Sequence, residues 1–154
     1  MSKILIIKTS SIGDILQAFF VLPYLKKAGH TIDFVVDDRH KALVKAHPFI
    51  DKVVVCDFSG WLKKEKKKVS FSFFKKDLQS KTYDMVFDLQ RNWKSSIILF
   101  FTKTKRKIGY GKNSVREKIN LLFTNEKYEI DKKQNIRFFY LALFQEVFSD
   151  LKEE

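Results

Sequence analysis

The sequence predicts an α/β fold of the Rossmann-like class, in which a parallel sheet carries helices on both faces. Short apolar runs alternate along the chain with segments of helical periodicity. The first run, residues 4–7, is apolar at every position, as in parallel strands that are buried on both faces. A turn of small and polar residues, 8–14, leads from this run into the first helix. The alternation predicts right-handed crossovers and one sheet.

The elements follow in a regular order. We expect strands at 4–7, 31–36, 53–56, 85–87 and 107–109, and helices over 14–28, 39–46 and 93–101, with an apolar helical face over 136–148. Gly29 stands where a helix commonly ends in glycine. Pro23 predicts a kink or break within the first helix, and Pro48 ends the next one.

The turn at residues 8–14 falls at the carboxyl edge of the predicted sheet, where open α/β folds bind ligands. Gly13 permits a close backbone approach or a positive φ. Ser11 and Asp14 have the spacing of a capping box, and the helix N-terminus favours the ionised carboxylate. Asp14 is therefore either a simple cap or a group able to accept a proton. The polar residues before it favour a site.

Composition indicates one basic, globular domain. The chain has 154 residues, enough for a proper core, with 30 Lys and Arg against 18 Asp and Glu and a net charge of +12. This balance favours nucleic acid, a membrane surface or a phosphorylated substrate as partner. The single Cys56 is expected in a buried strand, in keeping with a reducing cytoplasm. Neither a signal peptide nor an apolar run of the ~18 residues that span a membrane is visible.

A lysine-rich stretch interrupts the alternation. Residues 62–81 contain eight lysines against Glu65 and Asp77, a local charge of +6. The stretch is either a solvated helix face or loop, or a basic arm whose interleaved aromatic residues anchor it to the fold or to a lipid surface. Nucleic-acid binding is a third use of such residues. No RNA- or DNA-binding module accompanies them, and lysine lacks the geometric selectivity of arginine.

Common enzyme signatures are missing. The chain has no phosphate-binding loop of the G-x-x-x-x-G-K-[ST] type, and residues 109–111 lack the third glycine of a dinucleotide fingerprint. His30, His40 and His47 have no metal-ligand spacing and are expected at the surface. No nucleophile elbow is present. We therefore expect neither a metal nor a cofactor.

Several blocks resemble the bacterial lipopolysaccharide heptosyltransferases, especially the heptosyltransferase I type. The opening residues 4–14 are similar to that family's first strand and loop. Residues 83–84, 88–90 and 94–96 resemble its next fingerprint, and residues 107–110 and 116–125 continue in similar order. The family has a histidine and then an arginine near the end of this region, whereas this chain has Asn135 and Phe139.

The resemblance implies a glycosyltransferase of the two-lobed GT-B type, in which residues 1–154 form the N-terminal, acceptor-binding lobe. The family transfers heptose from ADP-heptose to the Kdo sugar of the lipopolysaccharide inner core, with inversion and without a metal. The similar proteins are longer, and their second lobe holds most of the nucleotide sugar. A chain lacking that lobe is expected to have little or no activity alone.

The resemblance also implies roles for residues and partners. Asp14 matches the catalytic base. The loop that faces the sugar and diphosphate comprises Lys8, Thr9, Ser10, Ser11 and Gly13. Arg116 matches an acceptor-binding arginine, and Lys63 and Lys64 fall near a basic acceptor-binding segment. The implied partners are ADP-heptose, a Kdo–lipid A acceptor and the anionic surface of the inner membrane. The chain is either an excised domain, the product of a split or interrupted gene, or half of a two-chain enzyme whose second lobe is a separate chain. The alternative is a basic α/β module that binds anionic membrane or nucleic acid without chemistry.

Overall fold

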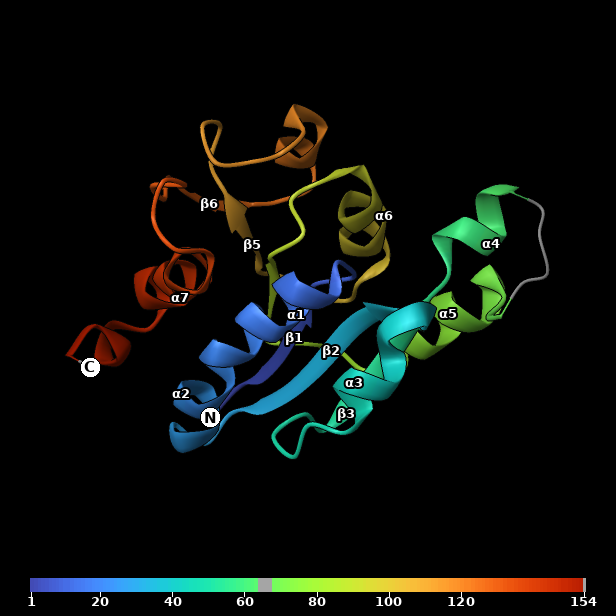
Figure 1. The fold of residues 1–154 in the computed structure, drawn as a ribbon, viewed down its shortest axis with the longest axis horizontal. Coiled ribbons are helices and arrows are strands. Elements are labelled where there is room, and N and C mark those ends of the chain that lie inside the picture. The colour runs from blue at the N-terminus through green and yellow to red at the C-terminus, as the bar shows by residue number, and fades with distance from the viewer. Residues whose placement is uncertain (64–67, 154) are drawn as a thin grey trace.

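The computed structural model describes residues 1–63 and 68–153, which form a six-stranded sheet in the order β3-β2-β1-β4-β5-β6 (Figure 1). The strands are β1 Lys3–Ile7, β2 Thr31–Asp37, β3 Lys52–Cys56, β4 Met85–Asp88, β5 Lys107–Tyr110 and β6 Glu126–Tyr128. Each of these neighbouring pairs is parallel. Strands β2 and β3 extend the sheet on one side of β1, and β4, β5 and β6 extend it on the other side. The order therefore reverses between β1 and β4, which confirms the Rossmann-like prediction.

Helices cover both faces of the sheet, as the alternation predicts. They are α1 Ile12–Ala18, α2 Leu22–Lys27, α3 Lys41–Lys45, α4 Phe58–Lys63, α5 Phe71–Leu78, α6 Trp93–Phe101 and α7 Ile136–Val147. Ile4 and Ile6 point into a core shared with α1, α2 and α7. Leu5 and Ile7 point into a second core with α5 and α6. This alternation explains why β1 is apolar at successive positions.

Most predicted boundaries hold to within a few residues. The first helix breaks at a 3₁₀ helix, Phe19–Val21, and Pro23 lies in the first turn of α2, where its missing N–H removes no hydrogen bond. Gly29 ends α2 with a φ of 87°. The helix expected over 39–46 is divided into the 3₁₀ helix Asp38–His40 and α3. Strand β6 was not predicted, because it is only three residues long and partly exposed.

The surface placement expected for the histidines is wrong for His30. This residue is buried, its Nδ1 accepts a hydrogen bond from the backbone N–H of Ser2 at 3.0 Å, and its ring packs against Phe148. His47 is half-buried against Phe19. Cys56 is buried and free, as expected. Phe148, which packs against the core, therefore holds His30 in a buried position in place of the expected surface one.

The lysine-rich stretch begins in the last turn of α4 and contains α5. The rings of Phe58, Phe71 and Phe74 pack around Trp61, whose Nε1 donates a hydrogen bond to Val69 O at 2.7 Å. Most of the interleaved aromatic residues therefore anchor this segment to the fold, which is one of the expected alternatives. Phe73 is the exception, since it is 61% exposed.

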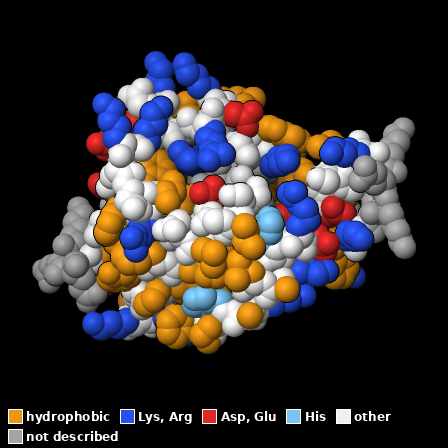
Figure 2. All heavy atoms as spheres, viewed as in Figure 1, with side chains coloured by type: hydrophobic (Ala, Val, Ile, Leu, Met, Phe, Trp, Pro, Cys, Tyr) orange, Lys and Arg blue, Asp and Glu red, His pale blue; other side chains and the backbone are white. Residues whose placement is uncertain are grey.

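Basic and hydrophobic side chains gather over different elements on one face of the molecule. In the view of Figure 2, Lys and Arg side chains spread over the upper part, where Figure 1 places β5, β6 and α6, and hydrophobic side chains gather over the region of α1 and α2. In the described part of the chain, no helix has the length and apolar character needed to cross a bilayer.

Candidate functional site

The loop after β1 lies at the carboxyl edge of the sheet, between the ends of β2 and β4. The backbone N–H of Lys8 donates to Val35 O, at 3.2 Å, which ties the loop to β2. On the other side, Gln90 Oε1 accepts hydrogen bonds from the N–H groups of Thr9 and Ser10, at 3.2 and 3.4 Å. The predicted position of residues 8–14 at the carboxyl edge of the sheet is confirmed, and the strand order places this loop at the switch point between β1 and β4.

The Asp14 carboxylate lies between two cations. Its Oδ2 atom is 3.9 Å from Lys8 Nζ and 3.9 Å from Arg116 Nη2, and its side chain is 30% exposed. Ser11 Oγ donates a hydrogen bond to the same oxygen at 3.4 Å, and Gly13 is exposed beside it. The structure thus brings together Lys8, Ser11, Asp14 and Arg116, although a hundred residues of sequence lie between Asp14 and Arg116.

The capping-box prediction for Ser11 and Asp14 is wrong. Ser11 occupies the N-cap position of α1, but its hydroxyl binds no backbone N–H of the helix. The hydroxyl instead points to the Asp14 carboxylate, which faces the cations of the loop. The alternative in which Asp14 serves only as a cap therefore loses its support.

Lys8 is a fully buried cation. Its Nζ makes no hydrogen bond within the described residues and lies 5.6 Å from the ring centroid of Tyr140. Burial lowers the pKa of Lys8 to about 8, and the nearby Asp14 carboxylate offsets part of that effect. An ammonium without a hydrogen bond is costly in such a place, so the carboxylate is its main compensation.

Asp88, at the end of β4, fixes the next loop. Its carboxylate accepts hydrogen bonds from the N–H groups of Gln90 and Arg91, at 2.9 and 3.1 Å, from Ser95 Oγ at 2.8 Å and from Asn120 Nδ2 at 2.7 Å. Burial raises the pKa of Asp88, whereas these donors favour its ionised form. The network joins β4, α6 and the segment after β5, and it sets the position of Gln90 and Arg91.

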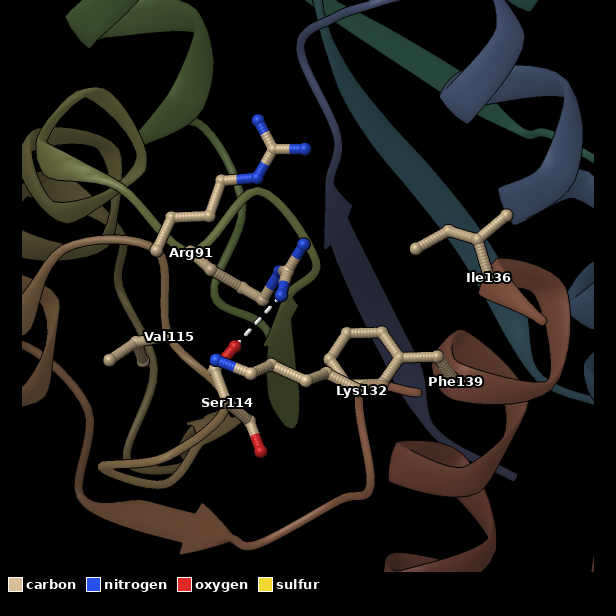
Figure 3. Close-up of a pocket in the computed structure, with 7 residues that line it drawn as sticks. Arg91, Ser114, Val115, Lys132, Ile136 and Phe139 are labelled. Atoms are coloured by element: carbon tan, nitrogen blue, oxygen red, sulfur yellow. Dashed lines mark hydrogen bonds between the residues drawn. The ribbon is translucent and has the colours of Figure 1, made fainter. Parts of the chain in front are cut away.

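A pocket of about 400 Å³ opens beside Arg116 (Figure 3). It is lined by Arg91, Ser114, Val115, Arg116, Lys132, Ile136 and Phe139. Three of these side chains are cationic and none is acidic. The lining comes from the loops after β4, β5 and β6 and from α7. Arg91 was not among the predicted site residues, although it directly follows the block at 88–90.

The remaining predicted site residues are less connected. Lys63 is exposed at the end of α4 and forms no ion pair with Asp14. Lys64 lies outside the described residues. Asn135 caps α7, because its side chain accepts a hydrogen bond from Arg137 N, and Phe139 stacks on Tyr110. Within residues 1–63 and 68–153 no cluster of three or more His, Cys, Asp or Glu can hold a metal ion.

Known proteins match this chain over nearly its whole length. Residues 72–154 match glycosyltransferase family 9 (heptosyltransferase). Lipopolysaccharide heptosyltransferase 1 of Campylobacter coli is 33% identical over 143 residues, 92% of this chain and 40% of that protein. The structure of the E. coli heptosyltransferase WaaC with ADP is 30% identical with a TM-score of 0.83, and the match covers 95% of this chain and 46% of that one. A second WaaC structure, with ADP-2-deoxy-2-fluoro heptose, has a TM-score of 0.84 at 28% identity, and the match covers 96% of this chain and 48% of that one. The chain thus spans less than half the length of these relatives.

Proposed function

Because the chain belongs to glycosyltransferase family 9, the heptosyltransferase family, we propose that it is the acceptor-binding lobe of an enzyme that transfers heptose from ADP-heptose to Kdo in the lipopolysaccharide inner core. Its fold is the N-terminal lobe of the two-lobed GT-B architecture. The observation that carries the proposal is the partly exposed Asp14 carboxylate, which lies between Lys8 and Arg116 at the switch point of the sheet.

The proposed chemistry is a single displacement with Asp14 as the base. The acceptor hydroxyl oxygen attacks the anomeric carbon of the heptose and forms the new glycosidic bond. The bond between that carbon and the ADP oxygen breaks, and ADP leaves with the electron pair. Asp14 accepts the hydroxyl proton as the attack proceeds. Its 30% exposure leaves the carboxylate open to a substrate, while its contacts hold it in place.

The other residues divide between the two substrates. We assign the loop of Lys8, Thr9, Ser10, Ser11 and Gly13 to the side facing the transferred sugar and its diphosphate. Arg116 binds an anionic group of the acceptor, where its planar guanidinium suits a carboxylate or phosphate. We assign Lys63 and Lys64 to the acceptor as well, because they fall near the family's basic acceptor-binding segment in sequence. A net charge of +12 fits a protein that works on an anionic lipid at the cytoplasmic face of the inner membrane.

Donor binding depends mainly on the second lobe of the GT-B architecture, which residues 1–154 do not include. The test is isothermal titration of the chain with ADP-heptose and, separately, with a soluble Kdo-bearing acceptor. We expect acceptor binding without comparable donor binding, and negligible turnover. Robust turnover of ADP-heptose by these residues alone would contradict the need for a second lobe, and failure to bind the acceptor would contradict the proposal itself.

The alternative function is a basic module that attaches to anionic membrane or nucleic acid. The lysines of α4 and α5 are the observation in its favour. An Asp14→Asn variant separates the two, when it is assayed with a complementing second lobe. A binding module is indifferent to the change, whereas a transferase loses most of its rate. Affinity for nucleic acid would also fall steeply with salt.

A further inference from the structure

Arg91 is a buried arginine whose donors are not all used. The residue is 6% exposed and holds a φ of 63°, a backbone conformation that residues other than glycine rarely adopt. Its Nη1 donates to Ser114 O at 2.8 Å (Figure 3), but its Nε has no hydrogen-bond partner within the described residues. A buried donor without a partner in the wall of a pocket points to a ligand.

The guanidinium of Arg91 is held by stacking as well as by hydrogen bonding. Its central carbon lies 4.7 Å from the ring centroid of Phe139 and 5.5 Å from that of Tyr110. Those two rings stack on each other at 4.4 Å. Ser114, which accepts the Nη1 hydrogen bond, is itself tied to Ile130, because its hydroxyl donates to Ile130 O at 2.6 Å. The planar group is therefore positioned before any ligand arrives, which lowers the entropy cost of binding.

Arg116 is coupled to Arg91 through the backbone. The N–H of Arg116 donates to Arg91 O at 3.2 Å, and both side chains line the same pocket. Burial lowers the pKa of Arg91, and the positive charge of Arg116 adds to that effect, although an arginine stays protonated at any ordinary pH. Arg91, Arg116 and Lys132 line the same pocket, and none of the lining residues is acidic. An anion placed there would relieve their repulsion.

We infer that Arg91 and Arg116 together bind an oxyanion of the acceptor in this pocket, so that Arg91 is an acceptor-binding residue. The inference rests on the proposed function and extends it to a residue outside the predicted set. Because Arg116 also lies 3.9 Å from Asp14, an oxyanion held here brings the neighbouring acceptor hydroxyl toward the base. The oxyanion is either a sugar-acid carboxylate or a phosphate group of the acceptor, since a guanidinium binds both.

The experiment uses the chain as it is and three probes: a Kdo methyl glycoside, its neutral methyl ester and inorganic phosphate. Binding is followed by titration calorimetry and by NMR shifts of Phe139 and Ser114. Arg91→Gly suits the positive φ and removes the guanidinium, while Arg91→Lys keeps the charge without the planar fork. Lys112→Gln is the control, because Lys112 is exposed, precedes the lining residue Ser114 by two positions and is not itself part of the lining.

We expect the glycoside to bind the unmodified chain at least ten times more tightly than the ester. Arg91→Gly should weaken glycoside binding about tenfold or more, because a hydrogen bond to a charged group is worth roughly 1.5–3 kcal/mol. The affinity of Arg91→Lys should lie between those of the unmodified chain and Arg91→Gly. Lys112→Gln should bind the glycoside within about twofold of the unmodified chain. If circular dichroism shows that Arg91→Gly is unfolded, glycoside binding by Arg91→Lys tests the inference.

The outcomes separate this inference from the proposed function. Equal glycoside binding by the unmodified chain and both Arg91 variants would overturn the role of Arg91 and leave the acceptor-binding lobe intact. Phosphate binding that requires Arg91, with no glycoside binding, would support the oxyanion site, assign it to phosphate and count against Kdo recognition. No binding of either anion by the unmodified chain would overturn the inference.

Discussion

The ammonium of Lys8 and the carboxylate of Asp14 lie 3.9 Å apart, one fully buried and the other partly exposed. Lys8 ends up in the interior because it directly follows the buried β1, and no described acceptor reaches its Nζ. Asp14 stands one loop further on, where solvent and substrates have access. The pair therefore places a buried ammonium group behind the carboxylate to which we assign proton transfer, and this arrangement can be tested through Lys8.

Lys8 should make stability depend on pH. Its pKa is about 8 in the folded chain against 10.5 for the ordinary side chain, so the folded state binds fewer protons than the unfolded state between these values. The free energy of unfolding must then rise with pH in that window. Lys8→Met lacks the titrating group. We expect the free energy of unfolding of the unmodified chain, relative to Lys8→Met, to rise by about 2 kcal/mol from about pH 7 to about pH 9.5.

Urea denaturation at a series of pH values measures this difference. The series should stop short of pH 10, because burial raises the pKa values of Tyr83, Tyr110 and Tyr140 and their unfolded forms begin to titrate there. Parallel curves for the two proteins would show that Lys8 titrates in the folded state as it does in water.

Asp14→Asn should lower the pKa of Lys8 further. The carboxylate raises the Lys8 pKa against the larger effect of burial, and an amide of the same shape removes that support. NMR titration of the Lys8 side chain, labelled at Cε, reports the shift directly. Asp131→Asn serves as the control, because Asp131 is exposed and is not among the charges that act on Lys8. An unchanged Lys8 titration in Asp14→Asn would mean that the two groups do not interact.

The sequence was informative where a single local pattern determines the structure. The apolar residues 4–7 and the small polar residues after them predicted β1, its loop and the place of Asp14 in the first turn of the next helix. Pro23 and Gly29 marked the break and the end of the first helical segment because each restricts or permits a particular backbone conformation.

Long-range contacts were not predictable in the same way. Asn120 donates to Asp88 across 32 positions, and neither residue has a local pattern that reveals its partner. The Arg91 guanidinium depends on the stacked rings of Tyr110 and Phe139, which come from β5 and α7. The aromatic residues of α4 and α5 were visible, but the lysines between them obscured their role as core.

Asp88→Ala should be severely destabilising. The change removes the acceptor of two backbone N–H groups, those of Gln90 and Arg91. It also removes the shortest hydrogen bonds of Asn120 Nδ2 and Ser95 Oγ, which retain their 3.0 Å contacts with Ser96 Oγ and Asn92 O, respectively. Loss of such a network costs about 3–5 kcal/mol, so the variant should unfold at much lower urea concentration. The exposed Asp131→Ala should change stability by less than about 0.5 kcal/mol. A small effect of Asp88→Ala would mean that water replaces the carboxylate in this network.

Two tyrosines offer the same chemical change with opposite expected results. Tyr110 donates its hydroxyl hydrogen to Phe139 O at 3.0 Å, whereas the buried hydroxyl of Tyr140 has no hydrogen-bond partner within the described residues. Tyr110→Phe should therefore lower the free energy of unfolding by about 1 kcal/mol. Tyr140→Phe removes a desolvated polar group without a partner and should leave stability unchanged or raise it by about 1 kcal/mol. Denaturant unfolding of the two variants side by side measures both effects, and a loss at Tyr140 equal to that at Tyr110 would show that the Tyr140 hydroxyl has a partner in solution.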